Sequence, residues 1–93
     1  MSWEGGDRRK RYARAFGAVL RDYRKRAGIT QDELAARAGF DRTFPSLLER
    51  GLRTPTLTVF CVLAEALSVS PADLMSATAA ERAGTPQEKL GKH

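Results

Sequence analysis

Apolar residues recur at helical spacing along most of the chain. Between Arg9 and Ala27 they fall three or four residues apart, with arginines between them, at Tyr12, Phe16, Val19, Leu20 and Tyr23. This spacing predicts one face of an amphipathic helix that Gly28 ends. No segment of the chain shows a strand signal, and the sequence therefore predicts an all-α fold.

Two short helices are predicted after this first one. Thr30 and Glu33 form a capping box, which begins the second helix. Gly39 ends this helix after about two turns. The next helix stops before Gly51, and Pro45 indicates that it begins late, because proline disfavours helical angles in the residue before it. Its candidate caps are Asp41, Thr43 and Phe44. Helices this short need packing against another element, for which the first helix is the candidate.

Two further helices complete a predicted five-helix bundle. Thr56 can cap the fourth, and Ser70 followed by Pro71 is a strong start signal for the fifth, with Leu74 as its main anchor. From Thr78 the apolar stripe is lost. The expected organisation is a flexible end over residues 1–8, one domain over residues 9–77 and a disordered tail over residues 78–93.

Composition narrows the class of protein. Of the 93 residues, 42% are hydrophobic and 29% charged, which fits one small globular domain. The longest apolar run, residues 59–64, is too short to cross a membrane, and no signal peptide is visible. A lone cysteine, Cys61, and a lone histidine, His93, favour neither a disulfide nor a metal site. We expect a cytoplasmic protein that is not an enzyme and needs no cofactor, metal or small-molecule ligand.

The net charge of +5 is concentrated near the N-terminus. Residues 1–28 hold nine Lys or Arg against three Asp or Glu, a net +6. Such a patch attracts polyanions, either nucleic acid or an acidic membrane surface, and a solvated helix surface is the alternative. The basic cluster from Arg8 to Arg14 has the same two interpretations, an arm reaching the DNA backbone or minor groove or a solvated helix start.

The predicted second and third helices have the architecture of a helix-turn-helix. Ala35 is small where the two helices must approach, Gly39 sits at the bend, and Phe40 and Leu48 close the underside. The order and spacing of several motifs resemble the phage-repressor/Cro-type (XRE, lambda-repressor-like) helix-turn-helix family, restriction–modification controller proteins among them. The motifs are FGxxLRxxR from Phe16, GITQxELA from Gly28, GFDRT from Gly39, LERG from Leu48 and PTL from Pro55.

The resemblance implies a DNA-binding site on this motif. Base edges would be read from the start of the third helix, by Arg42, Thr43, Ser46 and Leu47. Arginine suits guanine and a threonine methyl suits thymine. Leu47 stands where many relatives carry a polar residue, and it either touches a thymine methyl or is partly core. Phosphate contacts are implied for Gln31, Arg50, Arg53 and Arg24.

Arg24 has a second implied role, in a partly buried salt bridge with Glu49 that joins the first and third helices. The fourth helix is apolar on more than one face, which predicts a two-fold dimer through Val59, Val62 and Leu74. A compact monomer is the alternative.

The expected function is transcriptional regulation by a homodimer on a palindromic operator, as a repressor that blocks RNA polymerase or as an activator that recruits it. Two alternatives remain open. One is a DNA-binding antitoxin that holds its toxin through the residues after Thr78. The other is a module whose third helix binds a polypeptide.

Overall fold

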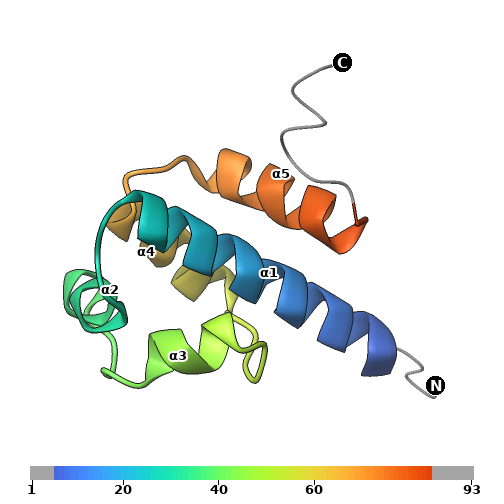
Figure 1. Ribbon diagram of the computed structural model, residues 1–93, viewed down its shortest axis with the longest axis horizontal. Coiled ribbons are helices and arrows are strands. Elements are labelled where there is room, and N and C mark those ends of the chain that lie inside the picture. The colour runs from blue at the N-terminus through green and yellow to red at the C-terminus, as the bar shows by residue number, and fades with distance from the viewer. Residues whose placement is uncertain (1–5, 85–93) are drawn as a thin grey trace.

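The structure, a computed structural model, describes residues 6–84, which form five helices joined by short turns (Figure 1). These helices are α1 (Gly6–Arg26), α2 (Gln31–Ala38), α3 (Phe44–Glu49), α4 (Leu57–Ala66) and α5 (Pro71–Arg82). Residues 6–84 contain no strand. The predicted all-α, five-helix architecture is confirmed.

The long helix α1 has two of the other helices packed along it, while α2 and α4 pack against each other and against α3 and α5 respectively. Helix α1 packs against α3 and against α5, which runs beside it in the opposite direction (Figure 1). Phe16, Val19 and Leu20 are buried as their spacing predicts, and the Phe16 ring lies 5.4 Å from that of Phe60 on α4. Tyr12, at the end of the stripe, remains 45% exposed.

The predicted starts of α2, α4 and α5 agree with the structure. The Thr30 hydroxyl accepts the Glu33 amide at 3.0 Å, and the Glu33 carboxylate accepts the Thr30 amide at 2.9 Å, which completes the capping box of α2. Thr56 caps α4 by accepting the Val59 amide, and Ser70 caps α5 ahead of Pro71.

Leu74 anchors α5 in the core and is fully buried. Its side chain therefore faces the chain's own interior, and its predicted place in a dimer interface is wrong. Val59 and Val62, predicted for the same interface, are half-buried on α4.

The helical domain extends past both predicted boundaries. α1 begins at Gly6 rather than near Arg9, and α5 continues to Arg82 rather than losing order from Thr78. Thr78 is buried, and its hydroxyl donates to the Leu74 carbonyl oxygen at 2.9 Å. Ala77 and Ala80 are buried as well, so that small side chains carry the packing of this end of α5. Residues 1–5 and 85–93, parts of the predicted flexible ends, lie outside the described residues.

Over residues 6–84, no single helix has the length and apolar character to span a membrane. The α4–α5 pair, bent by 108°, meets that criterion only when the two are taken together, by length and composition alone. The same residues hold no group of three or more His, Cys, Asp or Glu side chains that could bind a metal ion.

Candidate nucleic-acid interface

The turn between α2 and α3 is held by one glycine and two aromatic rings. Gly39 ends α2 with φ at 74°, a left-handed conformation that costs glycine nothing because it has no Cβ. The next amide, that of Phe40, donates to the Ala35 carbonyl oxygen at 2.9 Å. The Phe40 ring then meets Phe44 edge to face, with centroids 5.4 Å apart. These contacts fix the direction in which α3 leaves the turn.

Asp41 holds the first residues of α3 in place. Its carboxylate accepts hydrogen bonds from the backbone amide and the hydroxyl of Thr43, each at 2.8 Å. Because these bonds stabilise the charged form, the amide most strongly, they lower the pKa of Asp41 below its ordinary value. Thr43 is the N-cap and Pro45 lies in the first turn, which confirms the late start predicted for this helix. Arg42 is therefore exposed in a braced turn just before α3.

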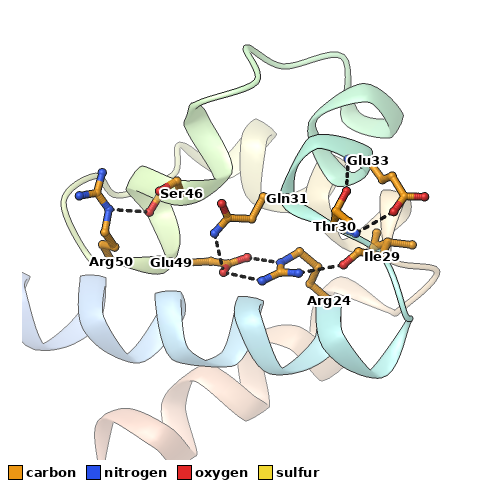
Figure 2. A network of polar contacts seen from close by, with 8 residues as sticks. All are labelled: Arg24, Ile29, Thr30, Gln31, Glu33, Ser46, Glu49 and Arg50. Carbon is orange, nitrogen blue, oxygen red and sulfur yellow. Dashed lines mark hydrogen bonds and ion pairs between the residues drawn. The ribbon is translucent and has the colours of Figure 1, made fainter.

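A buried carboxylate joins α1, α2 and α3 (Figure 2). Glu49, whose side chain is 3% exposed, accepts from Arg24 Nε at 2.6 Å and Nη2 at 3.0 Å, and from Gln31 Nε2 at 3.0 Å. Arg24 Nη1 also donates to the Ile29 carbonyl oxygen at 2.8 Å. The hydrogen bond to Glu49 is the main reason that the pKa of Arg24 lies above its ordinary value.

The backbones of α1 and α3 approach each other at Gly17. A Cβ placed there would lie 2.4 Å from the carbonyl oxygen of Leu48 and 2.7 Å from that of Glu49. Any side chain larger than hydrogen would have to push α3 away from α1. Gly17 and the Arg24–Glu49 pair together set the position of α3 against the core.

On the outer side of this assembly, α2 and α3 form an open concave surface. We call it the α2–α3 surface, and the residues that line it are Gln31, Asp32, Arg42, Thr43, Ser46, Leu47 and Arg50. It carries two arginines, one carboxylate, amide and hydroxyl groups and one half-buried leucine. These groups can bind phosphate oxygens, donate to and accept from base edges, and contact an apolar methyl group.

The N-terminus of α2 adds backbone donors to this surface. The capping box uses the amides of Thr30 and Glu33, and it lowers the pKa of the Glu33 carboxyl, mainly through the Thr30 amide. The backbone amides of Gln31 and Asp32 have no hydrogen-bond acceptor within the described part of the chain. Free amides at a helix N-terminus attract anions.

The structure brings together six of the residues predicted to contact DNA: Gln31, Arg42, Thr43, Ser46, Leu47 and Arg50. Arg53 is exposed on the loop after α3, outside the concavity, where its Nη1 donates to the Leu52 carbonyl oxygen at 3.3 Å.

Arg24 requires a correction. Its side chain is 11% exposed, and Nε, Nη1 and Nη2 all donate to groups of the chain itself. The salt bridge implied for Arg24 is present in the structure. The phosphate contact also implied for it is wrong, because its guanidinium is held between Glu49 and the Ile29 carbonyl oxygen.

Two features of the site escaped the sequence prediction. The side-chain amide of Gln31 donates to Glu49, and Asp32 places a negative charge among the residues that line the surface. The first depends on how α2 crosses α3, which residue spacing does not encode. The second could have been found, because Asp32 follows Gln31 in the first turn of a predicted helix.

The fold and this surface define a DNA-binding module of the helix-turn-helix class. In this class the second of the two helices of the motif, which corresponds to α3 here, enters the major groove. A family model described as a helix-turn-helix domain matches residues 15–77. The chain belongs to this family of DNA-binding transcriptional regulators, which are not enzymes.

Several proteins resemble the chain closely. The HTH-type transcriptional regulator y4dJ of Sinorhizobium fredii is 44% identical over 62 residues, which cover 67% of this chain and 80% of that one. The crystal structure of the clp gene regulator ClgR from Corynebacterium glutamicum has a TM-score of 0.74 at 32% identity, and the match covers 87% of each chain. The restriction-modification controller protein C.AhdI from Aeromonas hydrophila has a TM-score of 0.65 at 37% identity, covering 67% of this chain and 94% of that one.

Proposed function

We propose that the protein binds double-stranded DNA sequence-specifically through the α2–α3 surface and regulates transcription by occupying an operator. The observation that carries the proposal is the convergence of six predicted contact residues on one exposed concavity. An operator in chromosomal DNA implies a cytoplasmic protein. Occupancy blocks or recruits RNA polymerase according to where the operator lies.

Base recognition is assigned to the start of α3. Arg42 is exposed in the turn braced by Asp41, so its guanidinium can make a bidentate contact with guanine O6 and N7. Thr43 and Ser46 offer hydroxyls, and half-buried Leu47 offers an apolar surface to a thymine methyl group. These four side chains carry the proposed specificity.

Phosphate contacts are assigned to the two sides of α3. On one side are the Gln31 side chain and the backbone amides of Gln31 and Asp32. On the other are Arg50, exposed at the end of α3, and Arg53 on the following loop. The hydrogen bond to Glu49 holds the side-chain amide of Gln31 at a fixed position. This reduces the entropy that the Gln31 side chain loses when it binds a phosphate.

Selection from a pool of random DNA duplexes tests this proposal. The wild-type chain should enrich one motif, and Arg42→Ala should relax the preference at one position of each half-site, with a loss of about 1–3 kcal/mol in binding free energy. Arg37→Ala is the matched control, because Arg37 is exposed on α2 but does not line the α2–α3 surface. Enrichment of no motif by the wild type, or equal effects of the two variants, would contradict the assignment.

We also propose that the protein acts as a homodimer on a palindromic operator. One small module covers only about 600–1,000 Å² of DNA surface, and two-fold pairing doubles the contact. Half-buried Val59 and Val62 remain candidates for the interface on α4. Leu57 and Met75, which are 78% and 50% exposed, border an open apolar groove between α1, α4 and α5.

The double variant Leu57→Lys/Met75→Lys is expected to sediment as a monomer where the wild type sediments as a dimer. Both side chains are exposed, so the charges should separate protomers without unfolding them. Ala36→Lys on the exposed face of α2 is the control and should leave the dimer intact. A wild-type chain that is monomeric at high micromolar concentration would refute the dimer.

A further inference from the structure

The first half of α1 is basic and projects from the core. Residues 8–21 include six Lys or Arg and no Asp or Glu. Residues 6–12 are all exposed, and burial begins only at Ala13. Seven helical residues extend about 10 Å, and the blue end of α1 extends beyond the core in Figure 1, with Arg11 and Tyr12 lying beside the end of α5 at Arg82.

The chain neutralises the arginines at the other end of this helix. Arg24 pairs with Glu49, and Arg26 pairs with Asp22 at 2.7 Å. Within residues 6–84, no such ion pair is present for three basic residues of the first half of α1, Lys10, Arg11 and Arg14. Arg14 lies four residues from Lys10 and three from Arg11, spacings at which like charges repel each other on a helix. An external polyanion would relieve this repulsion.

The basic end of α1 adjoins the loop that follows α3. A Cβ on Gly51 would lie 3.1 Å from Cγ and 3.3 Å from Cα of Arg14, so the loop rests directly on α1 at this point. Arg50 precedes Gly51 in that loop. Lys10 and Gly17 share a face of α1 with Arg14, and Gly17 touches α3. Positive charge therefore continues from the edge of the α2–α3 surface along α1.

The surface where α1 meets α5, next to these residues, is also basic. Arg11, Arg14 and Arg82 line a shallow hollow there with one acidic residue, Glu81. The Arg82 guanidinium lies over the Tyr12 ring at 5.1 Å, and its Nε is buried without a hydrogen-bond partner among the described residues. Three arginines against one glutamate leave the hollow with a net positive charge.

We infer that Lys10, Arg11 and Arg14 form a second DNA contact, which binds backbone phosphates flanking the segment held by the α2–α3 surface. The inference rests on the proposed function. The positive charge complements any polyanion, and continuity with the α2–α3 surface, through Arg14 and the Gly51 loop, favours duplex DNA over an anionic membrane. Because these side chains would meet phosphates rather than base edges, the contact would add affinity and salt dependence but no sequence preference.

The test compares two double variants that lose the same charge. Lys10→Gln/Arg11→Gln removes the basic end of α1, and Lys25→Gln/Arg37→Gln removes one lysine and one arginine from exposed positions elsewhere. The probe is the duplex that wild type enriches from a random pool, either with 15 base pairs of flank on each side or trimmed to the enriched motif. Binding is measured at several salt concentrations, and circular dichroism checks that every chain keeps its helices.

On the flanked duplex, Lys10→Gln/Arg11→Gln should bind about tenfold more weakly than wild type, and the slope of log K against log salt should be shallower by about 2. Its preferred motif should be unchanged. The control pair should bind within about threefold of wild type. On the trimmed duplex, Lys10→Gln/Arg11→Gln should match the control pair.

Equal losses for the two double variants on the flanked duplex would overturn the inference while leaving the proposed function intact. A wild type that binds no duplex would refute the proposed function itself. Vesicles of phosphatidylglycerol and phosphatidylcholine provide the remaining arm. If Lys10→Gln/Arg11→Gln abolishes vesicle binding but leaves DNA binding unchanged, the basic end of α1 is a membrane contact and the inference is wrong.

Discussion

Replacing Gly17 with alanine is expected to lower the free energy of unfolding by about 2–3 kcal/mol, the cost of overpacking a tight contact. The new Cβ would lie 2.4 Å and 2.7 Å from the carbonyl oxygens of Leu48 and Glu49. Both are backbone atoms, so no side-chain rotation can relieve the clash. Alanine also favours helix over glycine by about 1 kcal/mol, but that gain is smaller than the clash.

Chemical denaturation of the two chains measures this effect, and Gly6→Ala is the control. Gly6 lies on the same helix, and a Cβ there has no neighbour within 4 Å, so the same chemical change should be neutral or slightly stabilising. The displaced α3 should also weaken DNA binding by Gly17→Ala. A Gly17→Ala chain as stable as wild type would show that α1 and α3 are not in this close contact.

Glu49→Ala is the second large effect, a loss of about 3 kcal/mol in the free energy of unfolding. Removing the carboxylate leaves the Arg24 guanidinium, only 11% exposed, with its charge uncompensated. The substitution also removes the acceptor that holds the side-chain amide of Gln31 at the α2–α3 surface. The variant should therefore lose stability and, at temperatures where it is folded, some affinity for DNA.

Asp22→Ala is the matched control for Glu49→Ala. It breaks an exposed ion pair of α1, in which the Arg26 and Asp22 side chains are 60% and 54% exposed. Exposed pairs contribute about 0–1 kcal/mol, so the melting temperature should hardly change. If the two variants melt alike, Glu49 does not carry the structural role assigned to it.

Local chemistry made much of the fold predictable. The Thr30–Glu33 capping box, the left-handed Gly39 and the Ser70–Pro71 start each depend on a few adjacent residues, and all are present in the structure. The extent of α5 was missed because its last turns pack through Ala77, Thr78 and Ala80. Small side chains give little signal in an apolar pattern, although they allow two helices to approach closely.

The candidate site was predictable where the motif order fixes positions and less so where side chains converge from different helices. Arg42, Thr43 and Ser46 lie on the surface that the resemblance implies. The Gln31–Glu49 hydrogen bond depends on three helices meeting at one point. The same is true of Arg24, whose guanidinium nitrogens all donate to groups of the chain itself. Leu74 was misassigned because α4 and α5 are both rich in apolar residues, and their pattern does not distinguish a core position from an interface position.

Mapping DNA contacts on the full chain by NMR tests the central claim most directly. Titration with the selected duplex should shift the amide signals of Gln31, Arg42, Thr43 and Ser46 most, because these residues line the α2–α3 surface. Signals of Glu65 and Ser76, exposed on α4 and α5, should stay in place. Large shifts centred on α4 and α5, with the α2–α3 surface unchanged, would contradict the account.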